Sequence, residues 1–193
     1  MKCENYFYNC SKEYIDSIED DLFSSILFTI ERLPKRNTQS EINHDLFWLL
    51  TYSGWSYDST PSGLLNSPIS DLCLNNIDKE IIKSRNNRNI CITSTNLNAN
   101  WHTDFAKAFD NKLVQIEAQF GKVESMFKDF CGFRISYYER RIVLGIEIVM
   151  YEPNKYFSHR KNSVTGMAYF DIAKQTLPII GLECPIWLIG IKE

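Results

Sequence analysis

Apolar positions near the start of the chain follow a helical period. The spacing predicts a helix over residues 12–33, which Pro34 then stops. The apolar residues that carry this pattern are Tyr14, Ile18, Leu22, Ile26 and Ile30. Ser40 is predicted as the N-cap of a second helix that ends near Gly54. A shorter helix is predicted at 77–84, so residues 1–90 are expected to be mainly helical.

The second half of the chain changes to a strand-like pattern. Runs rich in aromatic and β-branched residues predict strands at 101–109, 112–120, 133–139, 142–150 and 185–191. Between them, 122–130 and 165–177 have helical patterns. Neither a repeat nor a linker divides the chain. We therefore predict one α/β domain over 1–193, with a central mixed sheet in 98–193 flanked by helices.

Composition excludes several classes of protein. The chain has 193 residues, of which 44% are hydrophobic and 23% charged, as in ordinary soluble proteins. None of its segments approaches the ~18 uninterrupted apolar residues of a membrane span, and its N-terminus lacks the apolar core of a signal peptide. We expect a cytoplasmic protein without a membrane partner. The six cysteines include no CxxC pair, so a zinc site is not indicated.

The distribution of charge is more informative than the net charge of −3. Residues 1–60 contain 5 basic and 10 acidic side chains, whereas residues 61–193 contain 16 basic and 14 acidic ones. Such an asymmetry is compatible with a protein that presents one face to DNA. A mixed solvated surface would look the same, so charge alone does not indicate DNA binding.

The most informative segment is a predicted hairpin in residues 98–122. Asp110-Asn111 is a two-residue turn signal between two strand-like runs. A turn there fixes the cross-strand pairs as Phe109 with Lys112, Ala108 with Leu113, Lys107 with Val114, Ala106 with Gln115 and Phe105 with Ile116. The next pair is Asp104 with Glu117. Strand alternation places Gln119 on the same face as this pair.

Two carboxylates directly opposed in a hairpin indicate a metal site. Their Cβ atoms are expected ~5 Å apart, where like charges repel. A divalent cation removes the repulsion, and oxygen ligands of this kind suit Mg²⁺, which can activate water at a phosphate. The alternative is that Asp104 and Glu117 lie on an exposed face and bind nothing. Asp110 is the rival metal-binding aspartate, although a turn aspartate has a conformational role.

Three further residues are secondary candidates for this site. His102 shares the face of Asp104, but a histidine at a strand start is more often structural. Glu147 is unusual within the apolar run VLGIEIVM and either supports the metal site or is a buried polar residue with a partner. Glu41, in the second predicted helix, is a further candidate carboxylate for this site.

The hairpin residues resemble a known family. WHTDF followed by KLVQIEAQFGK resembles the active-site hairpin of BglII/BstYI-type restriction endonucleases, within the PD-(D/E)XK nuclease superfamily. Later segments fit as well, namely VLGIEIVM, NSVTG and PIWLIGI. The Asp-to-Glu spacing is longer than in the family, but a symmetric extension of the hairpin keeps Asp104 opposite Glu117. Gln119 stands where the superfamily usually has lysine, a substitution typical of this branch.

The resemblance implies a three-layer restriction-endonuclease-like fold and a type II restriction endonuclease. It implies Mg²⁺-dependent hydrolysis of both strands of double-stranded DNA at a short palindrome, by a homodimer. Asp104 and Glu117 would bind the metal and Gln119 would orient water or metal. The family also implies that residues at Lys122 and in the 162–166 turn approach the bases. The DNA-binding candidates are Lys122, Arg160, Lys161, Asn162, Ser163 and Thr165.

Structural roles without DNA contact are alternatives for some of these residues. Lys122 could be a solvated residue in a first helical turn, and Thr165 could cap the helix predicted after it. Competing functions are a nuclease of the same superfamily in repair or structure-specific cleavage, and a DNA-binding module that no longer cuts. The recognised bases do not follow from the sequence; relatives with a GATC core make that core a first guess.

Overall fold

The computed structural model describes residues 1–59, 61, 102–139, 141–158 and 164–193. The elements in chain order are β1 (Lys2–Tyr8), α1 (Lys12–Asp16), α2 (Leu22–Glu31), α3 (Gln39–Tyr52), β2 (Ser56–Tyr57), β3 (Phe105–Phe109), β4 (Lys112–Ala118), α5 (Val123–Tyr138), β5 (Leu144–Met150), α6 (Pro153–Tyr156), α7 (Phe170–Ile180) and β6 (Ile186–Lys192). The helix predicted at 77–84 lies outside the described residues.

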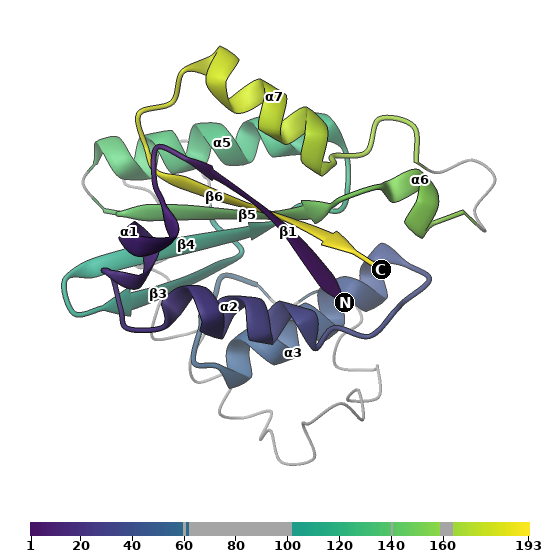
Figure 1. Ribbon diagram of the computed structural model, residues 1–193, viewed down its shortest axis with the longest axis horizontal. Helices are drawn as coiled ribbons and strands as arrows, with labels where there is room; N and C mark the ends of the chain where they lie inside the picture. Colours follow the sequence, from purple (N-terminus) through teal and green to yellow (C-terminus); the bar gives the residue numbers. More distant parts are fainter. Residues whose placement is uncertain (60, 62–101, 140, 159–163) are drawn as a thin grey trace.

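The strands of the described residues form one mixed sheet. Its order is β1-β6-β5-β4-β3-β2 (Figure 1). β4, β5 and β6 run parallel in the centre, while β1, β3 and β2 are antiparallel to their neighbours. The predicted α/β class with a mixed central sheet is therefore confirmed. The pairing of β4 with β5 in the parallel centre matters for the site, because it sets residues of the two strands level with each other.

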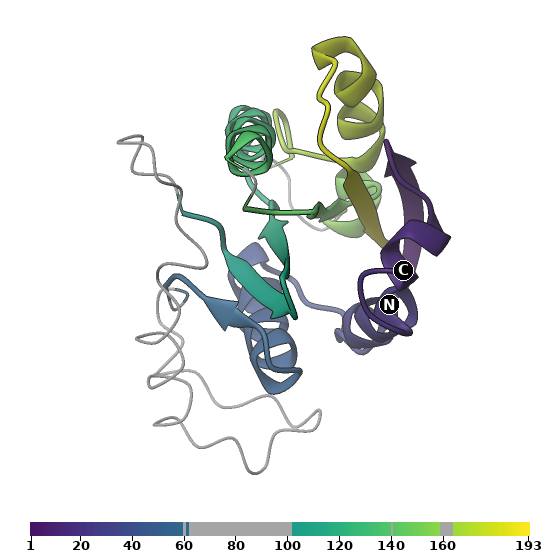
Figure 2. The same cartoon turned by 90° about the vertical axis from the view of Figure 1, so that its left-hand side faces the viewer.

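Helices cover both faces of this sheet. α2 and α3 lie on one face and α5 and α7 on the other (Figures 1 and 2). The first core joins Ile30 and Phe47 to strand residues such as Ile116 and Ile148. The second joins helix residues such as Phe130 to strand residues on the opposite face. The alternation of side chains along β4 and β5 thus separates two packed layers around the sheet.

Two strand glycines allow the helices to approach the sheet closely. A Cβ at Gly145 in β5 would lie 2.7 Å from the ring of Phe133 in α5. A Cβ at Gly190 in β6 would lie 2.6 Å from the ring of Phe170 in α7. Both distances are shorter than van der Waals contact, so these strand positions have room for hydrogen only. Helix α5 is consequently held directly over β4 and β5.

The predicted secondary structure was wrong for two elements. Residues 133–139 belong to α5 up to Tyr138 and do not form a strand. Met126, Phe130 and Phe133 are buried at helical spacing, and this packing outweighs the strand propensity of the aromatic residues that follow. The N-terminal strand β1 was not predicted, because its partner β6 lies at the opposite end of the chain.

The predicted helix over 12–33 is two helices. α1 ends at Asp16, and Asp21 adopts a left-handed conformation with φ of 58° before α2 begins. The side chain of Asp16 accepts a hydrogen bond from the Phe23 N–H, 3.0 Å away, at the start of α2. This local capping interaction competes with a continuous helix.

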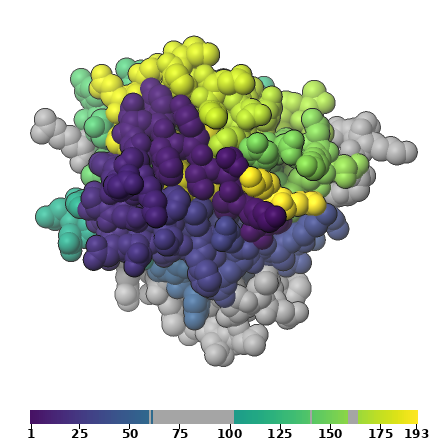
Figure 3. All heavy atoms as spheres, viewed as in Figure 1, coloured from purple at the N-terminus to yellow at the C-terminus, as the bar shows by residue number. Residues whose placement is uncertain are grey.

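Other predicted boundaries shifted by a few residues. The N-cap of α3 is Thr38 rather than Ser40, and Thr38 forms a capping box with Glu41. α7 begins at Phe170 rather than near Thr165, with Tyr169 as its N-cap. Figure 3 shows the purple N-terminal segment spread over one face of the molecule. Among the helices described, none combines the length and apolar character that a bilayer crossing requires.

Candidate active site

The β3–β4 hairpin has the predicted register. Phe105 pairs with Ile116 and Phe109 with Lys112, and the three pairs between them follow in order. Asp110 occupies the turn with φ of 51°, a left-handed conformation that aspartate tolerates well. The step beyond Phe105 and Ile116 brings Asp104 level with Glu117.

Asp104 and Glu117 contact each other's strands. The Asp104 N–H donates to Glu117 Oε2 at 3.3 Å. The Ala118 N–H donates to Asp104 Oδ2 at 3.0 Å. Asp104 itself is exposed and lines a hollow of about 140 Å³ beside α3, whereas Glu117 is only 5% exposed. Asp104 is therefore the more exposed residue of the pair and Glu117 the buried one.

Glu147 lies beside Glu117 on the neighbouring strand. The parallel pairing of β4 and β5 sets Glu117 level with Glu147. Glu147 is fully buried, and neither of its carboxylate oxygens has a hydrogen-bond partner among the described residues. Glu117 Oε1 is likewise buried without a partner in this part of the chain. An ionised carboxylate without a partner is costly in such a position.

Burial and mutual repulsion raise the pKa values of these acids. Burial raises the pKa of Glu117 well above its usual range, and the charges of Asp104, Asp129 and Glu147 add to the effect. Burial also raises the pKa of Glu147 well above its usual range, and the charges of Asp129 and Asp104 raise it further. Desolvation by the surrounding protein also raises the pKa of Asp104, whereas hydrogen bonds with the Ala118 N–H and the Glu117 side chain lower it. The ionised forms of these acids are therefore unfavourable together, and a bound cation would favour their ionisation.

Gln119 follows this pair at the end of β4. Its Oε1 accepts from the Gly121 N–H at 2.9 Å, and its Nε2 donates to Asp129 Oδ2 at 3.0 Å. Burial raises the pKa of Asp129 to about 6. Asp129 was not among the residues predicted for the site. Its signal in the sequence is an acidic residue at helical spacing from Met126 and Phe133, on the buried face of α5.

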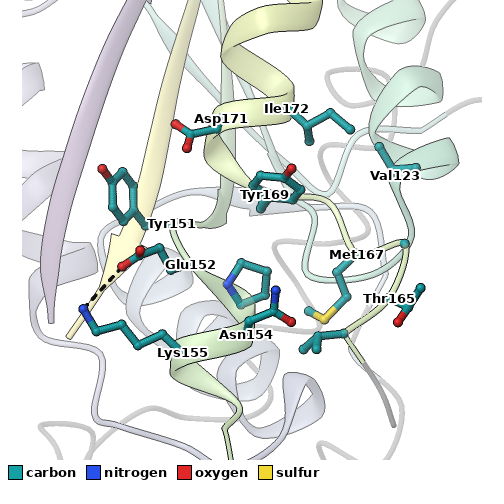
Figure 4. Close-up of a pocket in the computed structure, with 13 residues that line it drawn as sticks. Val123, Tyr151, Glu152, Asn154, Lys155, Thr165, Met167, Tyr169, Asp171 and Ile172 are labelled. Carbon is teal, nitrogen blue, oxygen red and sulfur yellow. Dashed lines mark hydrogen bonds and ion pairs between the residues drawn. The ribbon is translucent and has the colours of Figure 1, made fainter.

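Lys122 and Thr165 are brought together next to this strand. Lys122 is exposed at the N-cap of α5 and forms an isolated bridge with Met167. Two backbone hydrogen bonds tie the segments together, from Val123 N–H to the Gly166 carbonyl at 2.9 Å and from Ala168 N–H to the Gly121 carbonyl at 2.8 Å. Thr165 is exposed, does not cap α7, and lines a pocket of about 520 Å³ (Figure 4).

Three secondary candidates have other contacts in the structure. Asp110 is at the turn, roughly 20 Å along the strand from Glu117 at about 3.4 Å per residue. His102 Nδ1 lies 3.2 Å from Asp58 Oδ1, and the charge of Asp58 also contributes to the raised pKa of Asp104. Glu41 Oε2 accepts from the Thr38 N–H at 2.9 Å, within the capping box of α3.

The remaining predicted site residues lie outside the described part of the chain. They are Arg160, Lys161, Asn162 and Ser163.

Comparison with known proteins agrees with this architecture. The model of the family described as "Restriction endonuclease BglII/BglIII" matches residues 4–191. The chain belongs to this family. A solved structure titled "Crystal structure of restriction endonuclease BGLII complexed with DNA 16-mer" is similar, with a TM-score of 0.62 and 15% sequence identity. The match covers 100% of this chain and 77% of that one. A search of curated protein sequences gave no match.

Membership of the BglII/BglIII family assigns the class of reaction that the protein catalyses. The chain is a type II restriction endonuclease, a site-specific deoxyribonuclease that hydrolyses phosphodiester bonds of DNA. The predicted fold, activity and DNA partner are confirmed to this extent. The identity of the residues that perform the hydrolysis rests on the hairpin geometry.

The buried carboxyl of Glu147 predicts a pH effect on stability. Unfolded, Glu147 releases its proton near pH 4.3, whereas the folded protein retains it to higher pH because its pKa is raised. Since the native state then binds more protons, stability falls as pH rises above about 4.3, by at most about 1.4 kcal/mol per pH unit from this group. Glu147→Gln removes this loss, so its stability relative to the unsubstituted protein should increase with pH.

Urea unfolding at a series of pH values measures the difference. Glu124→Gln, which changes an exposed carboxylate of α5, controls for the substitution itself. A difference between Glu147→Gln and the unsubstituted protein that stays constant with pH would show that folding does not raise the pKa of Glu147.

Proposed function

We propose that Asp104 and Glu117 bind a catalytic Mg²⁺ for cleavage of both DNA strands at a short palindrome. The observation that carries the proposal is the hairpin register, which makes the two residues neighbours across β3 and β4. Their oxygens are the hard donors that Mg²⁺ prefers, and the buried, unpartnered Glu117 Oε1 is suited to such a ligand. The residues therefore fit the cation.

Two carboxylates are enough for this metal. Within the described residues, no group of three or more His, Cys, Asp or Glu side chains is arranged to hold a metal ion. Protein sites for Mg²⁺ commonly use one or two carboxylates and leave the other positions to water and substrate phosphate. When bound, the cation supplies charge neutralisation at the phosphate and activation of water. This composition of the site is also that of the PD-(D/E)XK nucleases which the hairpin resembles.

Gln119 contributes orientation rather than proton transfer. An amide cannot act as a cationic acid or as a base at neutral pH. Its Nε2 carries two hydrogens, one of which goes to Asp129. The other is available to a phosphate oxygen or to the attacking water, which sets the direction of attack.

Lys122 and Thr165 are proposed to face the DNA. Both are exposed, and the backbone hydrogen bonds between their segments fix them to the end of β4. A phosphate placed at the cation that Asp104 and Glu117 would hold would put the edge of the groove within reach of a lysine side chain at this position. We assign base reading to Lys122, with guanine O6 and N7 as the acceptors.

The active species is proposed to be a homodimer. A two-fold symmetric protein reads two identical half-sites and supplies one cutting centre per strand. Large apolar side chains on the α5 and α7 side of the sheet are exposed, notably Tyr138 at 82% and Ile179 at 84%. A second copy of the chain would remove these side chains from water.

Removal of either carboxylate tests the metal site. Asp104→Ala and Glu117→Ala should each abolish cleavage, since each loses a metal ligand. DNA binding should persist or tighten, because a negative charge that repels phosphate is removed. Cleavage and gel-shift assays of the same preparations measure both effects. Asp110→Asn removes the carboxylate, keeps a residue suited to the left-handed turn position, and is the matched control that should cut normally. The reverse pattern for Asp104 and Asp110 would mean that the metal binds elsewhere.

Binding curves at two salt concentrations test Lys122. Lys122→Ala should lower affinity for the cognate site by about 1–3 kcal/mol and relax the choice at one base pair. A lysine that contacts only phosphate would give equal losses on cognate and non-cognate duplexes, with a salt dependence shallower by about one unit. That result would remove Lys122 from the recognition set.

Mass measurement in solution tests the dimer. The unsubstituted protein should have the mass of two chains when bound to its DNA site, and Tyr138→Asp with Ile179→Asp should shift it to one chain. Phe28→Asp, at an exposed apolar residue of α2 on the other side of the sheet, is the control and should leave the dimer intact. A single chain of the unsubstituted protein on cognate DNA would contradict the proposal.

A further inference from the structure

The amide of Gln119 is fixed at both of its ends. The Gly121 N–H can only donate, so the atom it contacts at 2.9 Å is the amide oxygen. An ionised carboxylate can only accept, so the atom 3.0 Å from Asp129 Oδ2 is the amide nitrogen. These two partners determine the orientation of the amide and leave one N–H of Nε2 for another acceptor.

The contact with Gly121 depends on the absence of a side chain. A Cβ on this residue would lie 2.8 Å from Gln119 Oε1. The chain therefore turns tightly from β4 into α5 around the amide oxygen. This turn also sets the distance from Gln119 to α5, on which Asp129 lies.

Asp129 is an unfavourable residue for packing alone. It is 7% exposed and lies on the face of α5 that also carries the fully buried Met126 and Phe130. A carboxylate in such surroundings reduces stability unless a polar partner compensates, and the amide of Gln119 is its hydrogen-bond partner here. Its charge also contributes to the raised pKa of Glu117, one of the two proposed metal ligands.

We propose that Asp129 is a positioning residue for DNA cleavage, which holds Gln119 Nε2 so that its second N–H is directed at the phosphate or the attacking water. The inference rests on the proposed function of Gln119. It adds a residue from α5 to a site otherwise built from the β3–β4 hairpin. Asp129 contacts neither DNA nor metal in this account and acts through Gln119 alone.

Single-turnover cleavage and DNA affinity separate positioning from folding. Asp129→Ala should lower the cleavage rate by about 10- to 100-fold without weakening DNA binding. Asp129→Asn keeps an acceptor oxygen in nearly the same shape and should retain most of the rate. Glu124→Ala, which removes an exposed carboxylate from the same helix, should cut like the unsubstituted protein.

A double-mutant cycle tests the route through Gln119. If Asp129 acts only through this amide, Asp129→Ala should add no further loss in a Gln119→Ala background. Gln119→Glu should cut poorly because two carboxylates then meet. In the double variant Gln119→Glu with Asp129→Asn, the new asparagine amide donates to the new carboxylate. Its cleavage rate should therefore exceed that of Gln119→Glu alone.

The outcomes distinguish this inference from the proposed function. Full cleavage by Gln119→Ala would contradict the role of Gln119 and with it the inference. A slow Gln119→Ala variant in which Asp129→Ala causes an independent, multiplied loss would overturn the inference and leave the proposed function standing. Circular dichroism shows whether Asp129→Ala folds. If it does not fold, the cleavage rates of Asp129→Asn and of the double variant Gln119→Glu with Asp129→Asn decide the question.

Discussion

Repulsion between Asp104 and Glu117 is the constraint around which the site is built. The Asp110-Asn111 turn fixes the register of β3 and β4, and the register sets the two acids level with each other. β5 adds Glu147 beside Glu117, with no hydrogen-bond partner for its carboxylate in the described part of the chain. A fold that buries carboxyl groups in this way loses stability as the pH rises towards neutrality, and a cation that binds the folded state would offset the loss.

Helix α5 connects this charged cluster to the rest of the molecule. Gly145 lets the helix lie directly on the sheet, and Asp129 on its buried face accepts from the Gln119 amide. The N-terminus of the same helix carries Lys122, to which the segment of Thr165 is hydrogen-bonded through its backbone. The elements proposed for catalysis and for DNA recognition therefore both contact helix α5.

Local patterns predicted most of this arrangement, and tertiary packing decided the rest. The turn signal at Asp110-Asn111 was sufficient for the hairpin and for the Asp104–Glu117 pair, because a two-residue turn fixes every pair that follows. Strand β1 and the full length of α5 depend on partners distant in sequence, so neither was predicted correctly. Asp129 was missed for a similar reason, since its role appears only when α5 lies over β4.

The central claim is that the opposed carboxylates bind a divalent cation needed for site-specific cleavage. Digestion of plasmid DNA by the unsubstituted protein, with Mg²⁺ and again with excess EDTA, tests it most directly. The account predicts discrete double-strand fragments with Mg²⁺ and intact plasmid with EDTA. Fragments that persist in EDTA, or a smear in place of discrete bands, would contradict it.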